Sequence, residues 1–406
     1  MEKSVKSKQK FIILGALFFT WIVNYLDKLA INVAIIPIAE EFKLSATQSG
    51  LVISAFFLSY AIMQLVGGFL SDKYGARRMI LISVLMWSIF TVATGLAWSF
   101  ISLIVIRILF GIGEGSFPSA SSVAVADNFP RSERGRAKST LTAATTVGSI
   151  VSTVAAAALI VFMGWRLLFI GFGVLGLILT IVLYFILTPK EQQSDEESDG
   201  TSSKVPLKEL LKMPMVWQLM AMFFGINIVT WGLTSWMPTY MVKEMNLDMV
   251  SMGALAIIPA LAALVSTLVT GWLIDKLASG KEKYLVIVGA TIAAICLFSL
   301  ANISSVAMIV LFQSLTYVGL LMATTTIMTL PLKYFSNEVI GTTVGLINFG
   351  GQMAGAVSPA VIGFIITLFN GSYTGVFIFL MIMVLIPIIA AAKLQTNPQV
   401  KSNLQV

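Results

Sequence analysis

The segment WIVNYLDKLAIN (residues 21–32) places two charged side chains, Asp27 and Lys28, next to each other inside an apolar run that begins at Phe11. In a water-soluble protein such a pair is ordinary. Within a membrane span, each unpaired charge costs roughly 2.5–3.5 kcal/mol on insertion scales. The environment of this segment therefore determines the fold class, and the rest of the chain identifies that environment.

The composition is that of a membrane protein with many spans. Of the 406 residues, 57% are hydrophobic and 11% are charged, and the mean hydropathy is +0.92. A soluble domain carries about 25% charged residues. Histidine is absent and Cys296 is the single cysteine. This excludes a disulfide within one chain and any histidine-based site, so carboxylates must carry proton transfer near neutral pH.

Twelve apolar segments are long enough to cross a bilayer, which requires about 20 residues. The predicted spans are 11–37, 47–71, 77–97, 99–126, 137–163, 165–188, 214–241, 250–276, 284–301, 304–331, 338–368 and 372–393. The basic N-terminus runs directly into the first segment without a cleavage site, which predicts a span rather than a signal peptide.

A polar and acidic segment interrupts this pattern after the sixth predicted span. It is PKEQQSDEESDGTSSKVPLKELLK (189–212), and its composition is typical of a flexible linker. We therefore predict an all-α membrane fold of two six-helix bundles, residues 1–188 and 213–406, joined by a cytoplasmic linker at 189–212.

The distribution of lysine and arginine predicts the orientation. With the N-terminus inside, 21 basic residues fall on the inner side and 3 on the outer side. Cytoplasmic loops of membrane proteins carry such an excess, so we expect both termini in the cytoplasm and the chain in the cell membrane. The net charge of +7 follows from this bias, which argues against a nucleic-acid partner.

A weak internal repeat supports two similar halves. GGFLSDKYGARR (67–78) ends the second predicted span, and GWLIDKLASGKEK (271–283) ends the eighth. Both contain an Asp-Lys pair shortly after a glycine, at the same place in each half. Two like halves around a midplane site are typical of secondary transporters.

Four ionisable residues lie deep inside predicted spans: Asp27, Lys28, Arg107 and Glu114. Adjacent helical residues point in different directions, so Asp27 and Lys28 must find separate partners. Arg107 and Glu114 share one face of the fourth span, about 10.5 Å apart along its axis. Such groups line a wet cavity or carry function. The alternative is a set of static salt bridges that fixes helix packing.

Several motifs together resemble the major facilitator superfamily, and within it the anion:cation symporter family. These are NYLDK (24–28), the loop 67–78, RILFGIGEGSFPSASSVAVADNFPRSERGRA (107–137), WGLTSWMPTYMVKEMNL (231–247) and GLINFGGQMAGAVSP (345–359). The resemblance covers essentially the whole chain. It implies a twelve-helix transporter with no enzymatic activity and no cofactor, cycling between outward- and inward-open states.

The resemblance also implies roles for the buried charges. Asp27 and Glu114 fall at the family's proton-linked carboxylates, and Arg107 falls at the arginine that pairs with the first of them. Lys28 stands where the family usually has an arginine that grips the anionic substrate, with help from Arg107. Lysine keeps the charge but lacks the planar fork that holds a carboxylate at two points.

Further positions match polar residues that line the family's substrate pocket. They are Tyr25, Tyr60 and Gln64 in the first half, and Asn348 and Gln352 in the second. Thr145 stands where sugar-acid carriers can have a glutamine. The related organophosphate:phosphate antiporters carry a lysine at the place of Gln64, so its absence argues against a phosphate-ester exchanger.

The loop after the second span carries a candidate gate. Asp72, Arg77 and Arg78 fit a conformational latch, with PRSERGRA (130–137) as a possible partner segment. The alternative is that the arginines only set topology, which leaves Asp72 unexplained.

The function predicted from the sequence is proton-coupled uptake of a small organic anion by a monomer in the lipid bilayer. Drug or metabolite efflux by proton antiport is the alternative. It calls for an acidic pocket, whereas two cations balance the two acids here. A non-transporting sensor is a second alternative, although the short tails contain no signalling domain.

Overall fold

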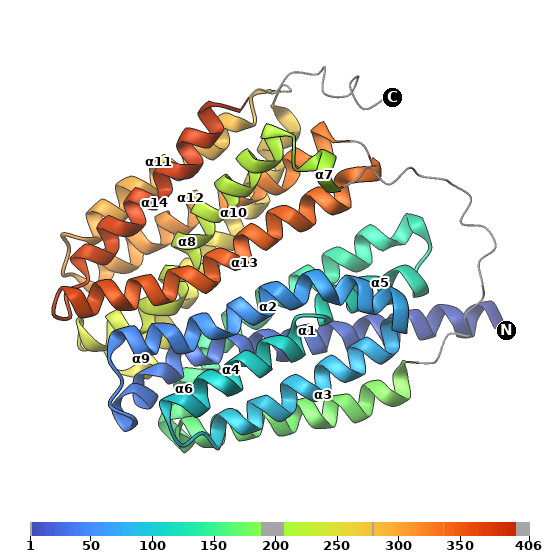
Figure 1. Cartoon of the computed structure of the whole chain (residues 1–406), viewed down its shortest axis with the longest axis horizontal. Coiled ribbons are helices and arrows are strands. Elements are labelled where there is room, and N and C mark those ends of the chain that lie inside the picture. Colours follow the sequence, from blue (N-terminus) through green and yellow to red (C-terminus); the bar gives the residue numbers. More distant parts are fainter. Residues whose placement is uncertain (1, 188–206, 278–279, 336, 395–406) are drawn as a thin grey trace. The chain divides into compact units, whose positions relative to one another are not determined.

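The computed structural model of the chain describes residues 2–187, 207–277, 280–335 and 337–394. In this part of the chain every regular element is a helix, which confirms the all-α prediction (Figure 1). The helices are α1 (Glu2–Glu41), α2 (Ala46–Tyr74), α3 (Ala76–Gly95), α4 (Phe100–Glu114), α5 (Phe117–Asn128), α6 (Arg131–Ile186), α7 (Leu207–Leu210), α8 (Pro214–Lys243), α9 (Met249–Leu255), α10 (Ile257–Lys276), α11 (Lys283–Leu300), α12 (Val306–Tyr334), α13 (Asn337–Leu368) and α14 (Thr374–Ala392).

Eleven helical segments in the described residues are long and apolar enough to cross a membrane. The longest, Glu133–Ile186, contains both the fifth and the sixth predicted spans. The two predicted spans, 137–163 and 165–188, are divided at residue 164, and the structure interrupts the helix at that residue. The chain turns at Gly164, whose φ of 80° and ψ of 160° interrupt the helical backbone. A glycine adopts this conformation without the clash that a Cβ atom causes, so this single residue connects the two helical segments.

Two other predicted spans are continuous in the sequence but broken in the structure. The fourth is divided into α4 and α5 at Gly115 and Ser116, and the eighth into α9 and α10 at Ala256. Pro118 lies in the first turn of α5, where its missing N–H group has no partner to lose. The first of these breaks leaves Glu114 as the last residue of α4.

The chain folds into two compact units. The N-terminal unit comprises Met1–Gln193 and Val242–Ala254, and the C-terminal unit comprises Ser194–Met241 and Leu255–Val406. Within the first, α1 and α3 pack on α6 and α2 packs on α4; within the second, α11 packs on both α12 and α14 (Figure 1). The predicted linker at 189–212 lies largely outside the described residues, and the proposed boundaries of the two bundles stay a prediction.

Capping residues determine where the first helices begin. Ser45 accepts a hydrogen bond from the backbone of Gln48, whose side chain in turn accepts from the Ser45 backbone, and this capping box starts α2. Ser99 and Ser102 form the same arrangement at the start of α4. Gly75, with φ of 82°, joins α2 to α3 directly.

Glycines allow α4 to lie close to both α2 and α3. A Cβ atom at Gly111 would overlap Ser59 and lie 2.5 Å from the carbonyl oxygen of Phe56 on α2. A Cβ atom at Gly113 would lie 3.0 Å from the backbone nitrogen of Trp87 on α3. This close approach brings the charged residues of α4 into the core of the N-terminal unit.

Candidate functional site

The four charged residues predicted to lie in the membrane gather in the core of the N-terminal unit. Asp27 and Lys28 come from α1, and Arg107 and Glu114 come from α4. Their exposed fractions are 2%, 4%, 1% and 1%, respectively. Charges buried this deeply need partners, and the partners they have indicate what the cluster does.

The ammonium of Lys28 is surrounded by aromatic rings and by one carboxylate. Its Nζ atom lies 3.5 Å from Oε1 of Glu114. It also lies 3.9 to 5.8 Å from the centroids of four rings, which we call the aromatic cage: Tyr25, Phe56, Phe57 and Tyr60. Ring faces attract a cation, and the attraction grows when water is excluded. The cage therefore compensates in part for the burial of the charge.

Asp27 has a different partner from Lys28, as the helical geometry predicts. Its Oδ2 atom accepts a hydrogen bond from the hydroxyl of Thr91 on α3. Arg107, the partner expected from the family resemblance, interacts with Asp27 electrostatically but forms no ion pair with it within 4.0 Å. The Asp27–Arg107 ion pair implied by the resemblance is therefore not formed between these described residues.

Many polar atoms around these charges have no hydrogen-bond partner among the described residues. Arg107 faces the rings of Phe110 and Phe169 at 5.2 and 5.6 Å. The unpartnered buried atoms of this region are Arg107 Nε and Nη2, both carboxylate oxygens of Glu114, Trp21 Nε1, Asn24 Nδ2 and Asn32 Oδ1. Buried polar atoms are nearly always satisfied by protein or by water. A concentration of unsatisfied ones marks a place where water or a polar ligand binds.

The polar residues predicted for the first half of the pocket lie at this cluster. Tyr60 accepts a hydrogen bond from Nε2 of Gln64 at 3.2 Å, and its ring belongs to the aromatic cage. Tyr25 also belongs to the cage, and its hydroxyl lies beside Thr145 of α6. Sequence reasoning missed Phe56 and Thr91, since neither residue type is unusual within an apolar span.

Asn348 and Gln352, predicted for the second half of the pocket, belong to α13 in the C-terminal unit. Oε1 of Gln352 is buried without a hydrogen-bond partner among the described residues. Asn227 of α8 lies nearby, with its Nδ2 atom 3.2 Å from where a Cβ of Gly351 would be. Their role in binding a substrate stays a prediction.

The three predicted gating residues differ in their surroundings. Arg77 donates hydrogen bonds to the carbonyl oxygens of Leu187 and, at 3.0 Å, of Tyr184 at the end of α6. Asp72 and Arg78 are exposed, and neither forms a hydrogen bond or ion pair with a described residue. Arg77 thus satisfies orphan carbonyl groups at a helix C-terminus, while the latch function of all three residues remains a prediction.

The C-terminal unit contains a matching contact and a buried carboxylate beside it. Lys283, at the start of α11, donates to the carbonyl oxygen of Leu394 at 3.0 Å, just after α14. Glu282, 1% exposed, accepts hydrogen bonds from Lys333 at 2.9 Å, Tyr334 at 3.1 Å and the backbone of Gly280 at 2.8 Å. Burial acts to raise the pKa of this carboxyl, but the Lys333 ammonium and the backbone N–H groups of Glu282 and Gly280 outweigh it and hold the pKa below its ordinary value.

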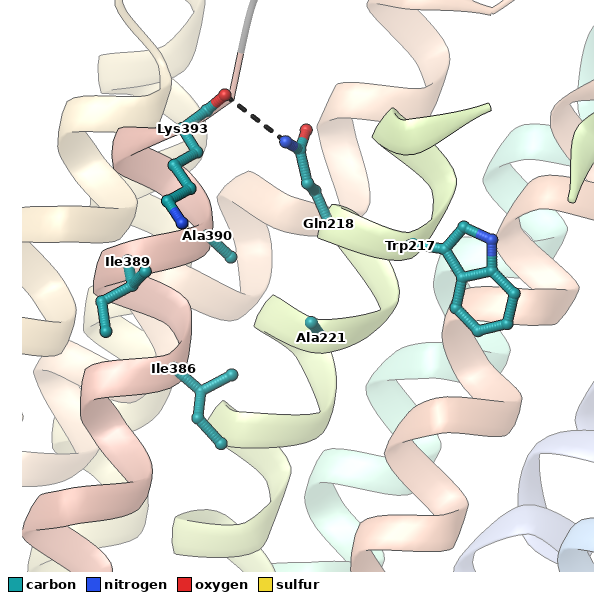
Figure 2. Close-up of a pocket in the computed structure, with 7 residues that line it drawn as sticks. All are labelled: Trp217, Gln218, Ala221, Ile386, Ile389, Ala390 and Lys393. Carbon is teal, nitrogen blue, oxygen red and sulfur yellow. Dashed lines mark hydrogen bonds between the residues drawn. The ribbon is translucent and has the colours of Figure 1, made fainter. Parts of the chain in front are cut away.

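A shallow groove of about 390 Å³ lies on the C-terminal unit between α8 and α14 (Figure 2). Nε2 of Gln218 donates to the carbonyl oxygen of Lys393 at 3.4 Å across it. The rest of its lining is largely apolar: Trp217, Ala221, Ile386, Ile389 and Ala390. It contains none of the buried charges. Among the described residues, no three His, Cys, Asp or Glu side chains gather to hold a metal ion.

Comparison with known proteins identifies the family. Residues 17–359 match the family model of the Major Facilitator Superfamily. The chain is 31% identical over 369 residues to the probable L-galactonate transporter of Escherichia coli (strain K12), covering 86% of this chain and 82% of that protein. It is 28% identical over 386 residues to the hexuronate transporter of Bacillus subtilis (strain 168), covering 92% and 91%.

A solved structure shows the same fold. A bacterial homolog of the human lysosomal transporter Spinster, in an inward-facing and unoccupied conformation, matches with a TM-score of 0.80 and 19% identity, covering 95% of this chain and 96% of that one. The family resemblance of the sequence is thereby confirmed: the chain is a multi-pass membrane transporter that belongs to the Major Facilitator Superfamily.

Proposed function

We propose that this protein carries a small organic anion, a sugar acid or a related carboxylate, into the cell together with protons. The names of its relatives support the anion, since they include hexuronate, L-galactonate and galactarate/D-glucarate transporters. The buried cluster of two carboxylates and two cations supports the coupling, because the protein has no histidine to carry protons. Substrate movement follows alternating access.

The Lys28–Glu114 pair is the observation that carries the proposal. The 3.5 Å separation is at the upper limit for a hydrogen bond, and the contacts of Glu114 with Lys28 and Asn24 lack good hydrogen-bond geometry. Glu114 is therefore a weakly held counter-ion for Lys28. A substrate carboxylate that binds Lys28 displaces Glu114, which then takes up a proton because a buried carboxylate without a counter-ion is unstable in its charged form.

Asp27 supplies the second proton site, and Arg107 contributes positive potential to both acids and to the incoming anion. Lys28 thus couples substrate binding to proton binding, because the substrate carboxylate and Glu114 compete for its ammonium.

The excess of lysine and arginine in one set of loops supports placing both termini in the cytoplasm and the protein in the cell membrane. We place the transporter there as a monomer.

The test is uptake of radiolabelled hexuronate and galactonate into proteoliposomes with an imposed pH gradient. We expect Glu114→Gln and Asp27→Asn to lose gradient-driven uptake, at least tenfold, while they keep exchange of labelled for unlabelled substrate. Lys28→Gln should lose both activities because it removes the cation that attracts the anion. Lys43→Gln, an exposed position, is the matched control and should behave as wild type.

Wild-type uptake by the Asp27 and Glu114 variants would remove their assigned roles. Transport of lipophilic cations out of the vesicles, with no effect of organic acids, would instead support proton-antiport efflux. Uptake that ignores the pH gradient in the wild type would leave an anion carrier without proton coupling.

A further inference from the structure

The hydroxyl of Thr91 lies between two oxygen atoms. One is Oδ2 of Asp27 on α1, and the other is the carbonyl oxygen of Trp87, one turn earlier on α3, at 2.8 Å. Thr91 and Asp27 are 0% and 2% exposed. The hydroxyl therefore has these two protein partners in a place from which bulk water is excluded.

A hydroxyl group has one hydrogen to donate, so it cannot donate fully to both oxygens at once. When Asp27 is ionised, its carboxylate can only accept, and the single hydrogen of Thr91 is drawn to it. When Asp27 is protonated, its own O–H group can donate to Thr91, and Thr91 is then free to donate to Trp87. When Asp27 is protonated, the carbonyl of Trp87 accepts the hydrogen of Thr91. When Asp27 is ionised, this carbonyl still accepts the helical hydrogen bond of the α3 backbone.

We propose that Thr91 is a positioning residue for the proton of Asp27, whose hydroxyl reverses its direction of hydrogen bonding when Asp27 gains or loses that proton. The side chain needs only to rotate its O–H bond. Asp27 thus keeps one hydrogen bond in both states, and its carboxyl group stays in one place throughout the cycle. This inference rests on the proposed role of Asp27 in proton coupling.

The surrounding charged groups cannot form a hydrogen bond with Asp27 in both of its protonation states. Arg107 and Glu114 of α4 act on Asp27 electrostatically, and Lys28 is its neighbour on α1. From α3, the contact is the uncharged hydroxyl. An arginine only donates hydrogen bonds, so it suits the ionised acid alone. A hydroxyl both donates and accepts, and Thr91 is the group that fits both forms.

The experiment uses purified protein and infrared difference spectra between acid and alkaline pH. The carbonyl stretching band of a protonated carboxyl that disappears in Asp27→Asn identifies Asp27. We expect Thr91→Val to shift this band in frequency, and Thr91→Ser to restore it. Thr94→Val is the matched control, since Thr94 is a buried threonine of α3 whose hydroxyl, within the described part of the chain, donates to the carbonyl of Phe90 at 2.9 Å and to no carboxylate.

The pH profile of uptake in proteoliposomes gives a second readout. A hydrogen bond to a charged acceptor is roughly twice as strong as one between neutral groups, so losing the hydroxyl penalises ionised Asp27 more. Uptake by Thr91→Val should therefore persist to higher pH, by about one unit. Thr91→Ala takes its place if the valine variant does not fold.

The outcomes separate the two proposals. An unshifted band and an unchanged profile in the hydroxyl-free variants, or equal shifts in Thr94→Val, would overturn the role of Thr91. A wild-type protein whose uptake ignores pH would overturn proton coupling, while the infrared band still decides whether Thr91 reports on Asp27.

Discussion

Two buried glutamates, each 1% exposed, have opposite surroundings. Both oxygens of Glu282 accept hydrogen bonds, from Lys333, Tyr334 and a backbone N–H group. Neither oxygen of Glu114 accepts one from a described residue. A fully bonded carboxylate holds its neighbours in place, whereas an unbonded one is ready to exchange its partner. This difference supports the proposed proton-coupling role of Glu114, which stays a prediction.

Glu282 predicts a pH dependence of stability. Because folding lowers the pKa of this carboxyl, its contribution is fully present above the pKa of the unfolded chain and is lost as the pH falls through the folded value. We expect Glu282→Gln to lower the thermal unfolding midpoint at neutral pH, with a difference from wild type that shrinks in acid. The exposed Glu244→Gln serves as control. A constant difference across the pH range would contradict this account.

Helix ends are joined in a similar way in both units. In the N-terminal unit, the third predicted span packs on the sixth through α3 and α6, and a basic residue at the start of α3 donates to carbonyls at the end of α6. In the C-terminal unit, α11 packs on α14 and Lys283 donates to Leu394. The internal repeat of the loop sequences therefore corresponds to a repeated capping contact.

Adjacent arginines allow a matched test of this contact. Arg77 bonds to the end of α6, whereas its neighbour Arg78 is exposed without a described partner. We expect Arg77→Gln to lower the unfolding midpoint by several degrees and Arg78→Gln to leave it unchanged, since only the first leaves carbonyl groups without a donor. Equal effects would mean that the arginines act through topology and charge alone. Uptake rates of both variants test the predicted gate.

For the whole molecule, the stoichiometry determines the response to membrane potential. If Asp27 and Glu114 both cycle, a monoanion enters with two protons and one net positive charge. An inside-negative potential then contributes about 2.3 kcal/mol per 100 mV. A potassium-diffusion potential of this size should raise the accumulation ratio of a monoanionic sugar acid about 50-fold at equilibrium. A dianionic sugar acid enters with two protons without net charge, so its accumulation should not change.

Much of the fold could be predicted because hydrophobic length alone identifies a span. The boundary between the fifth and sixth spans was predicted at residue 164, where the helix is interrupted, although the sequence does not reveal the backbone angles of Gly164. The four buried charges were predictable because they are unusual in a membrane. The pairing of Lys28 with Glu114 of the fourth span could also be expected, since few buried charges are available. The uncharged partners could not, because Thr91 and Phe56 are ordinary residues that reach the site only through the packing of α3 and α2 against α1 and α4.

The aromatic cage gives a physical meaning to lysine at position 28. An ammonium is nearly spherical, so its attraction to ring faces has little directional preference, whereas a guanidinium must keep its plane aligned with its partner. Lys28 can therefore act as a pivot, turning from Glu114 to a bound anion while it keeps its contacts with the cage. Recognition by such a pivot depends on charge more than on planar shape. We expect carboxylates and sulfonates of similar size to compete for this transporter on nearly equal terms.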